Sequence, residues 1–192
     1  MHVLFRVLRV LLPLAIVIAV VAAAVSLFTA RPDLEHAKRG LDRAWTPVAT
    51  RLGAHYTLLS AADGKLRGLS GPVRELADDV KVAIVRWQGA VASRDVEAQV
   101  HAANDLEALG HRLVATARDS RRVRADAGVS AAVEAYATDP AYATATTTAA
   151  VDAFNRAVNT YEQQRRGPVR AVVASLLGDD DIPAFASVRP PL

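Results

Sequence analysis

The sequence predicts an all-α protein: an N-terminal transmembrane helix followed by a long antiparallel four-helix, up-down bundle. Two observations predict this fold class. Val10–Ala30 is an apolar stretch without a charged residue, and a helix needs roughly 20 apolar residues to cross the hydrocarbon core of a bilayer. The rest of the chain carries apolar residues at intervals of three and four along several long segments. That spacing is typical of amphipathic helices.

The composition also favours close-packed helices. Apolar residues make up 52% of the 192 residues but aromatic residues only 5%, so the core must consist mainly of Ala, Val and Leu. The chain has no cysteine, which excludes disulfides and thiolate metal sites. A net charge of +3 is far from the dense basic surface of nucleic-acid-binding proteins. We therefore expect no nucleic-acid partner.

The N-terminus is interpreted as a basic flank, residues 1–9, followed by a membrane anchor, residues 10–30. A cleaved signal peptide is the alternative, because Arg6 and Arg9 give a basic start and Ala22–Ala24 would suit a signal peptidase. The apolar run continues past that site, which favours an uncleaved anchor. We expect a single-pass plasma-membrane protein whose partner is the lipid bilayer. The side of the bundle stays open, because the basic residues around the anchor give opposite indications.

The helical bundle is predicted to span residues 33–167. Four apolar stripes mark its long helices: Leu34 to Leu59, Leu66 to Val91, Val96 to Ala117, and Thr147 to Arg165. Short connections between consecutive stripes favour antiparallel packing of sequence neighbours. Trp45 and Trp87 lie on their stripes, so we expect both of them in the core.

Turn and capping residues predict the helix boundaries. The first turn is placed at Ala62–Gly64, with Gly68–Pro72 as the alternative. Pro47 is expected to kink the first helix, because proline removes one backbone hydrogen bond. Residues 125–138 form a shorter helical piece. Asp139-Pro140 then predicts the N-cap and first residue of the last long helix.

Residues 168–192 are predicted to form a short amphipathic segment and a proline-ended tail. In an up-down bundle that starts at a membrane, the fourth helix returns to the membrane. Basic and apolar side chains would then gather there; they are Arg31, Lys38, Arg39, Arg165, Arg166, Arg170, Val169, Val172, Val173 and Leu176. Our hypothesis is that this membrane-proximal patch binds anionic lipid headgroups. The alternative is that the segment packs on the bundle without lipid contact.

The C-terminal half also carries a motif pattern. An aromatic-Asn pair, an Ala-Val pair, a second aromatic residue, a Gly/Pro break and an apolar segment ending in Gly follow one another, and the residues are Phe154-Asn155, Ala157-Val158, Tyr161, Gly167-Pro168, Ala174, Leu177-Gly178 and Phe185. Upstream, Val123–Ala127, Leu113-Val114, Ala44-Trp45 and Leu52 fit the same pattern. The chain thereby resembles the bacterial LemA family over roughly residues 33–185. The resemblance implies an N-terminal membrane helix, a long antiparallel helical bundle and no established enzymatic activity.

The sequence departs from the LemA pattern in two places. The family's polar run after the first helical turns is replaced by His55–Ala62, and the polar start of its last helix is replaced by Asp139-Pro140 and a threonine run. If these segments carried the family's partner contacts, this chain has changed them.

Two Glu-His pairs could in principle bind a metal ion. Glu97 and His101, and likewise Glu107 and His111, stand four residues apart, and helical bundles do house such ligands. The two pairs are about 80° apart around the helix, so they do not converge. We expect a solvated ion-pair face and no metal site.

Two further polar runs have simple interpretations. Asp179–Asp181 lacks the spaced ligands and the glycine of a calcium loop, so we expect a solvated turn. Thr144, Thr146, Thr147 and Thr148 have no His or Lys at motif spacing to activate a nucleophile, so we expect an exposed face. No catalytic residue and no cofactor site is predicted.

The expected function is therefore non-enzymatic. The chain is interpreted as a membrane-anchored, LemA-like scaffold or protein-interaction module with unidentified protein partners, and homo-oligomerisation is left open. The alternative is a metal- or small-ligand-binding protein of the cell envelope.

Overall fold

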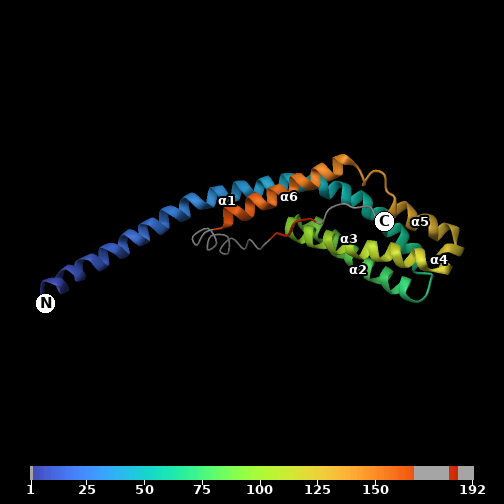
Figure 1. The fold of residues 1–192 in the computed structure, drawn as a ribbon, viewed down its shortest axis with the longest axis horizontal. Coiled ribbons are helices and arrows are strands. Elements are labelled where there is room, and N and C mark those ends of the chain that lie inside the picture. Colours follow the sequence, from blue (N-terminus) through green and yellow to red (C-terminus); the bar gives the residue numbers. More distant parts are fainter. Residues whose placement is uncertain (1, 167–181, 186–192) are drawn as a thin grey trace. The chain divides into compact units, whose positions relative to one another are not determined.

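The computed structural model describes residues 2–166 and 182–185, and side chains only from residue 32 onward within these ranges. All regular secondary structure in these residues is helical, which confirms the predicted all-α class (Figure 1). The helices are α1 (His2–Leu66), α2 (Pro72–Ser93), α3 (Val96–Asp119), α4 (Arg121–Ala125), α5 (Ala127–Ala137) and α6 (Ala145–Arg165). The chain divides into two compact units, residues 1–39 with 159–180 and residues 40–158 with 181–192.

Among the residues with described side chains, no helix combines the length and apolar character needed to cross a membrane. The predicted flank 1–9 and anchor 10–30 lie outside that set, although the helical backbone of α1 runs through them. Of the predicted segment and tail, 168–192, only residues 182–185 are described.

In the second unit, α1 from Gly40 onward, α2 and α3 follow one another with alternating direction (Figure 1). The turn between α1 and α2 is the later of the two predicted alternatives. Gly71 adopts φ +80, a conformation that glycine tolerates, and Pro72 opens α2. Asp95 caps α3 by accepting a hydrogen bond from the Ala98 amide at 3.1 Å.

The fourth side of the second unit is built from two helices instead of one. Asp126 caps α5 by accepting from the amides of Gly128 and Val129. A non-helical joint, residues 138–144, then separates α5 from α6. The predicted N-cap at Asp139 is wrong. The Thr144 hydroxyl caps α6 by accepting from the Thr147 amide at 3.1 Å, because Asp139 is engaged elsewhere.

Pro47 does not interrupt α1, whose helical residues continue on both sides of it. The helix does not end at Pro47, and the kink expected there stays a prediction. Two neighbouring threonines bond back to the preceding turn: the hydroxyl of Thr46 donates to the Asp42 carbonyl at 3.0 Å, and that of Thr50 donates to the Thr46 carbonyl at 2.9 Å. The helix thus tolerates the missing proline N–H.

The core of the second unit includes both tryptophans, as predicted, with Trp45 2% and Trp87 5% exposed. Trp45 donates its ring N–H to the Gln99 side-chain oxygen at 2.8 Å. Its ring lies 4.7 Å from that of Phe154 and 5.8 Å from that of Phe185 between ring centres. Trp45 therefore joins α1, α3, α6 and the C-terminal segment in one contact.

Asn155 fixes the segment Ile182–Phe185 on α6. Its side-chain amide donates to the Phe185 carbonyl at 3.0 Å, and its side-chain oxygen accepts from the Phe185 amide at 2.9 Å. Asn104 on α3 adds a bond to the Ala184 carbonyl at 3.2 Å. The aromatic-Asn pair found in the sequence thus holds a distant stretch of backbone next to Trp45.

Gly110 on α3 packs closely against Tyr136 on α5, and its replacement tests this packing. A Cβ at position 110 would lie 2.1 Å from the Tyr136 hydroxyl oxygen, whereas a Cβ at Gly53 on α1 would meet no atom within 4 Å. We expect Gly110→Ala to lower the free energy of unfolding by about 1–3 kcal/mol through overpacking. The matched Gly53→Ala change should raise it by up to about 1 kcal/mol. Urea unfolding measures both, and equal stability of the two variants would contradict this packing.

Candidate functional site

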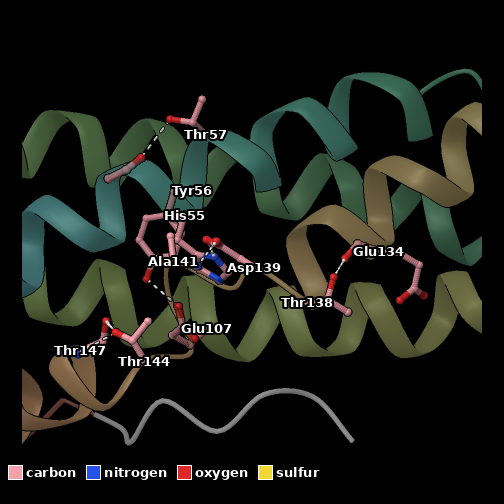
Figure 2. Close-up of polar contacts among 11 residues, drawn as sticks. His55, Tyr56, Thr57, Glu107, Glu134, Thr138, Asp139, Ala141, Thr144 and Thr147 are labelled. Carbon is pink, nitrogen blue, oxygen red and sulfur yellow. Dashed lines mark hydrogen bonds and ion pairs between the residues drawn. The ribbon is translucent and has the colours of Figure 1, made fainter.

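Six polar side chains meet inside the second unit, where α1, α3, α5 and the joint after α5 come together. Figure 2 shows His55, Tyr56, Glu107 and Asp139 among them. We call them the buried polar cluster, and each is between 3% and 8% exposed: His55, Tyr56, Glu107, Tyr136, Asp139 and Tyr142. Buried polar groups are costly unless they are hydrogen-bonded. The cluster is therefore the part of the molecule whose chemistry most needs an explanation.

His55 contacts a carboxylate and two aromatic rings. Its Nδ1 lies 2.9 Å from a carboxylate oxygen of Asp139, and the other Asp139 oxygen accepts from the Ala141 amide at 3.0 Å. The imidazole is stacked on the Tyr142 ring at 3.9 Å and on the Tyr136 ring at 4.4 Å between centres. Because a carboxylate only accepts, Nδ1 carries the proton in this contact.

Glu107 forms the second half of the cluster. The Tyr56 hydroxyl lies 3.0 Å from a Glu107 carboxyl oxygen and 3.1 Å from the Ala103 carbonyl. The Tyr142 hydroxyl is buried beside the same carboxyl and interacts with it. Burial raises the pKa of Glu107 from 4.5 to about 7, against smaller lowering by the hydroxyls of Tyr56 and Tyr142.

Burial acts on His55 in the opposite chemical sense. It lowers the pKa of the imidazole, and the bond to Asp139 offsets only part of this effect. Burial therefore favours the neutral forms of both side chains. Together they form a closed site beside the Asp139 carboxylate.

The predicted solvated Glu-His face is wrong for Glu107. Its side chain is 8% exposed and bonds with Tyr56, whereas His101 on the same helix is exposed. Among the described residues no group of three or more His, Cys, Asp or Glu side chains is arranged to hold a metal ion.

The threonine run is only partly exposed. Thr147 is 1% exposed and accepts a hydrogen bond from the Arg51 guanidinium at 2.9 Å, which agrees with its predicted place at the start of the last stripe and not with an exposed threonine face. Thr146 and Thr148 are exposed. The reason is the helix phase, because Thr147 starts the buried stripe of α6. The other predicted polar run, Asp179–Asp181, lies outside the described residues.

A groove of about 510 Å³ opens on the surface of the second unit between α1, α2 and the start of α3. Val91 lies on the core side of α2 and is nevertheless 44% exposed, because it faces this groove. The groove is lined by Asp42, Trp45, Thr46, Ala49, Thr50, Gly53, Trp87, Val91, Arg94, Val96 and Gln99. Sequence analysis did not predict it.

The predicted membrane-proximal patch is only partly described. Lys38, Arg39, Arg165 and Arg166 belong to the first unit, and Lys38, Arg39 and Arg166 are exposed. Arg165 pairs with the Glu162 carboxylate at 3.1 Å and lies over the Tyr161 ring at 5.6 Å. The other patch residues are Arg31, Val169, Arg170, Val172, Val173 and Leu176, and they lie outside the described side chains.

Comparison of the chain with protein-family models, with curated proteins and with solved structures finds no match.

The titration of Glu107 gives a testable pH dependence. A carboxyl whose pKa is raised on folding stabilises the folded state less as pH rises from the unfolded pKa to the folded one. The stability of the natural protein relative to a Glu107→Gln variant should therefore fall by about 1.4 kcal/mol per pH unit between about pH 5 and about pH 7. Glutamine still accepts from Tyr56 and carries no charge.

Chemical denaturation across this pH range measures the difference. Because His55 is present in both proteins, its own titration largely cancels. A stability difference that does not change with pH would contradict the raised pKa of Glu107.

Proposed function

We propose that this chain is a membrane-anchored, LemA-like helical bundle that acts as a non-enzymatic scaffold or protein-interaction module. The observation that carries the proposal is the closure of the buried polar cluster. Its His55–Asp139 pair and its Glu107 are the described groups best suited to acid-base chemistry, yet all three are at most 8% exposed. Catalysis needs such groups within hydrogen-bond reach of a substrate. Here their partners are the protein's own side chains.

The membrane anchor in this proposal rests on the apolar residues 10–30 and on the basic flank before them. The basic residues of the first unit would then favour anionic lipid headgroups, at about 1 kcal/mol for each residue near the surface. Up-down packing of the bundle is part of the same proposal, with α5 and α6 together forming its fourth side.

A small-ligand-binding protein of the cell envelope is the second candidate, and the groove beside Trp45 favours it. Pockets for small molecules commonly measure about 300–1,000 Å³ and have mainly apolar walls with a few polar groups. The groove, at about 510 Å³, combines two tryptophans and two valines with Asp42, Arg94 and Gln99. Binding there would need no change in the buried polar cluster.

Fractionation of the full-length protein tests the anchor. We expect the natural protein to stay in alkaline-washed membranes. A variant with Val17→Arg and Val20→Arg should move to the soluble fraction, because each arginine at a helix centre costs about 2.5–3.5 kcal/mol on insertion scales. The matched control is Val82→Arg with Val85→Arg on the exposed side of α2. Retention of both variants in membranes would contradict an anchor at residues 10–30.

The absence of native cysteine allows the side of the membrane to be determined in the same cells. Ser60 is exposed on α1, so a Ser60→Cys variant can be labelled with a membrane-impermeant maleimide. Labelling of intact cells would direct the search for partners to the envelope. Labelling only after lysis would direct it to cytoplasmic machinery.

A further inference from the structure

The short segment Ile182–Phe185 lies on the bundle without forming a helix or a strand. Two asparagines bond with its main chain. Asn155 on α6 pairs with both the amide and the carbonyl of Phe185, at 2.9 and 3.0 Å, and Asn104 on α3 donates to the Ala184 carbonyl at 3.2 Å. An asparagine side chain donates and accepts at once, so it can hold a main chain whatever side chains that chain carries. Domains that bind peptides gain affinity from main-chain hydrogen bonds in the same way.

Two side chains of the segment add selectivity to this contact. Ile182 is 7% and Phe185 is 2% exposed, whereas Ala184 between them is exposed. The Phe185 ring meets the Trp45 ring edge-on at 5.8 Å between centres, and Phe154 packs on the same tryptophan at 4.7 Å. The site therefore accepts an aliphatic residue followed three positions later by an aromatic residue, and it makes little demand on the residues between them.

We propose that this site, formed by Trp45, Asn104, Phe154 and Asn155, recognises a non-helical segment of a partner protein. The chain's own Ile182–Phe185 occupies the site as an exchangeable internal ligand. The partner segment carries the same pattern, a large aliphatic residue three positions before an aromatic one. This inference rests on the proposed role as a protein-interaction module, and it specifies the chemistry of the partner.

Competition with the internal segment determines which partner can use the site. Asn155 and Phe185 belong to one chain and are 30 positions apart, and such a tether gives the internal segment an effective concentration on the order of millimolar. The same segment of a second copy makes the same contacts without this advantage, so it does not displace the internal one. A segment of a different protein does so when it adds contacts on either side of its aromatic residue.

Peptide binding to the full-length protein tests the proposal. The probe is a fluorescently labelled peptide with the sequence of residues 180–187, and fluorescence anisotropy measures its binding. Phe185→Ala weakens the internal segment, so we expect this variant to bind the peptide at least about tenfold more tightly than the natural protein does. Ile182→Asp should have the same effect and leaves Phe185 in place. Circular dichroism should show an unchanged helix content in both variants.

Further variants identify the site to which the peptide binds. In the Phe185→Ala background, Asn155→Ala removes both bonds to the peptide main chain and should weaken binding about tenfold or more. The matched control is Asn159→Ala, at an exposed position one turn further along α6, which should not change the binding. A control peptide with alanine in place of its phenylalanine should bind at least about tenfold more weakly than the original peptide.

The proposal would be overturned by any of three results. Folded variants that fail to bind the peptide would show that the segment is held only as part of its own chain. Equal binding by the natural protein and both variants, or binding that is insensitive to Asn155→Ala, would place the peptide elsewhere. A dimer that forms with rising protein concentration and is lost in Phe185→Ala would assign the site to a second copy. Each result concerns this site alone, whereas failure of the proposed membrane-anchored module is measured separately by the fractionation of the arginine variants.

Discussion

The contact between His55 on α1 and Asp139 in the joint after α5 is the constraint on which the fourth side of the bundle depends. Backbone turn bonds shape residues 138–144 locally, with the amides of Tyr142 and Ala143 both donating to the Asp139 carbonyl, and the Asp139 side chain adds the attachment to α1. Asp139 bonds both to His55 at 2.9 Å and to the nearby Ala141 amide at 3.0 Å. Tyr136 and Tyr142 then enclose the imidazole from either side. The joint is thereby attached to α1 at one defined point.

Burial of this contact explains the unusual titration of its neighbours. Taking charged groups out of water disfavours their charged forms, which raises the pKa of Glu107 and lowers that of His55. The effects on stability have opposite signs. Glu107 costs stability as pH rises toward about 7, whereas His55 costs stability as pH falls below its unfolded pKa. These two side chains therefore favour the folded state most when both are neutral, near neutral or slightly acidic pH.

Sequence periodicity predicted the helical class, the two core tryptophans and most helix limits, because these depend on local spacing. It failed where a distant partner decides. Asp139-Pro140 has the local signature of a helix start, yet the carboxylate bonds with His55, 84 positions earlier. Glu107 could have been recognised, since it stands at the spacing of Val100, Ala103, Gly110 and Val114 and so occupies an apolar position. The groove beside Trp45 left no signal in the pattern.

The two segments at which the sequence departs from the LemA pattern contact each other in the folded chain. One begins with His55 and the other with Asp139, and these residues form the central hydrogen bond of the buried polar cluster. A change at one segment therefore alters the environment of the other.

A double-mutant cycle tests the central role of the His55–Asp139 contact most directly. The full-length protein would carry His55→Phe, which keeps a stacking ring, Asp139→Ala, or both, and urea unfolding at neutral pH would give each free energy. We predict a coupling energy of about 1–3 kcal/mol between the two positions. His55→Phe combined with Glu134→Ala, where Glu134 pairs with Arg118, serves as the additive control. Additivity of His55 and Asp139 within about 0.5 kcal/mol would contradict this account of the fold.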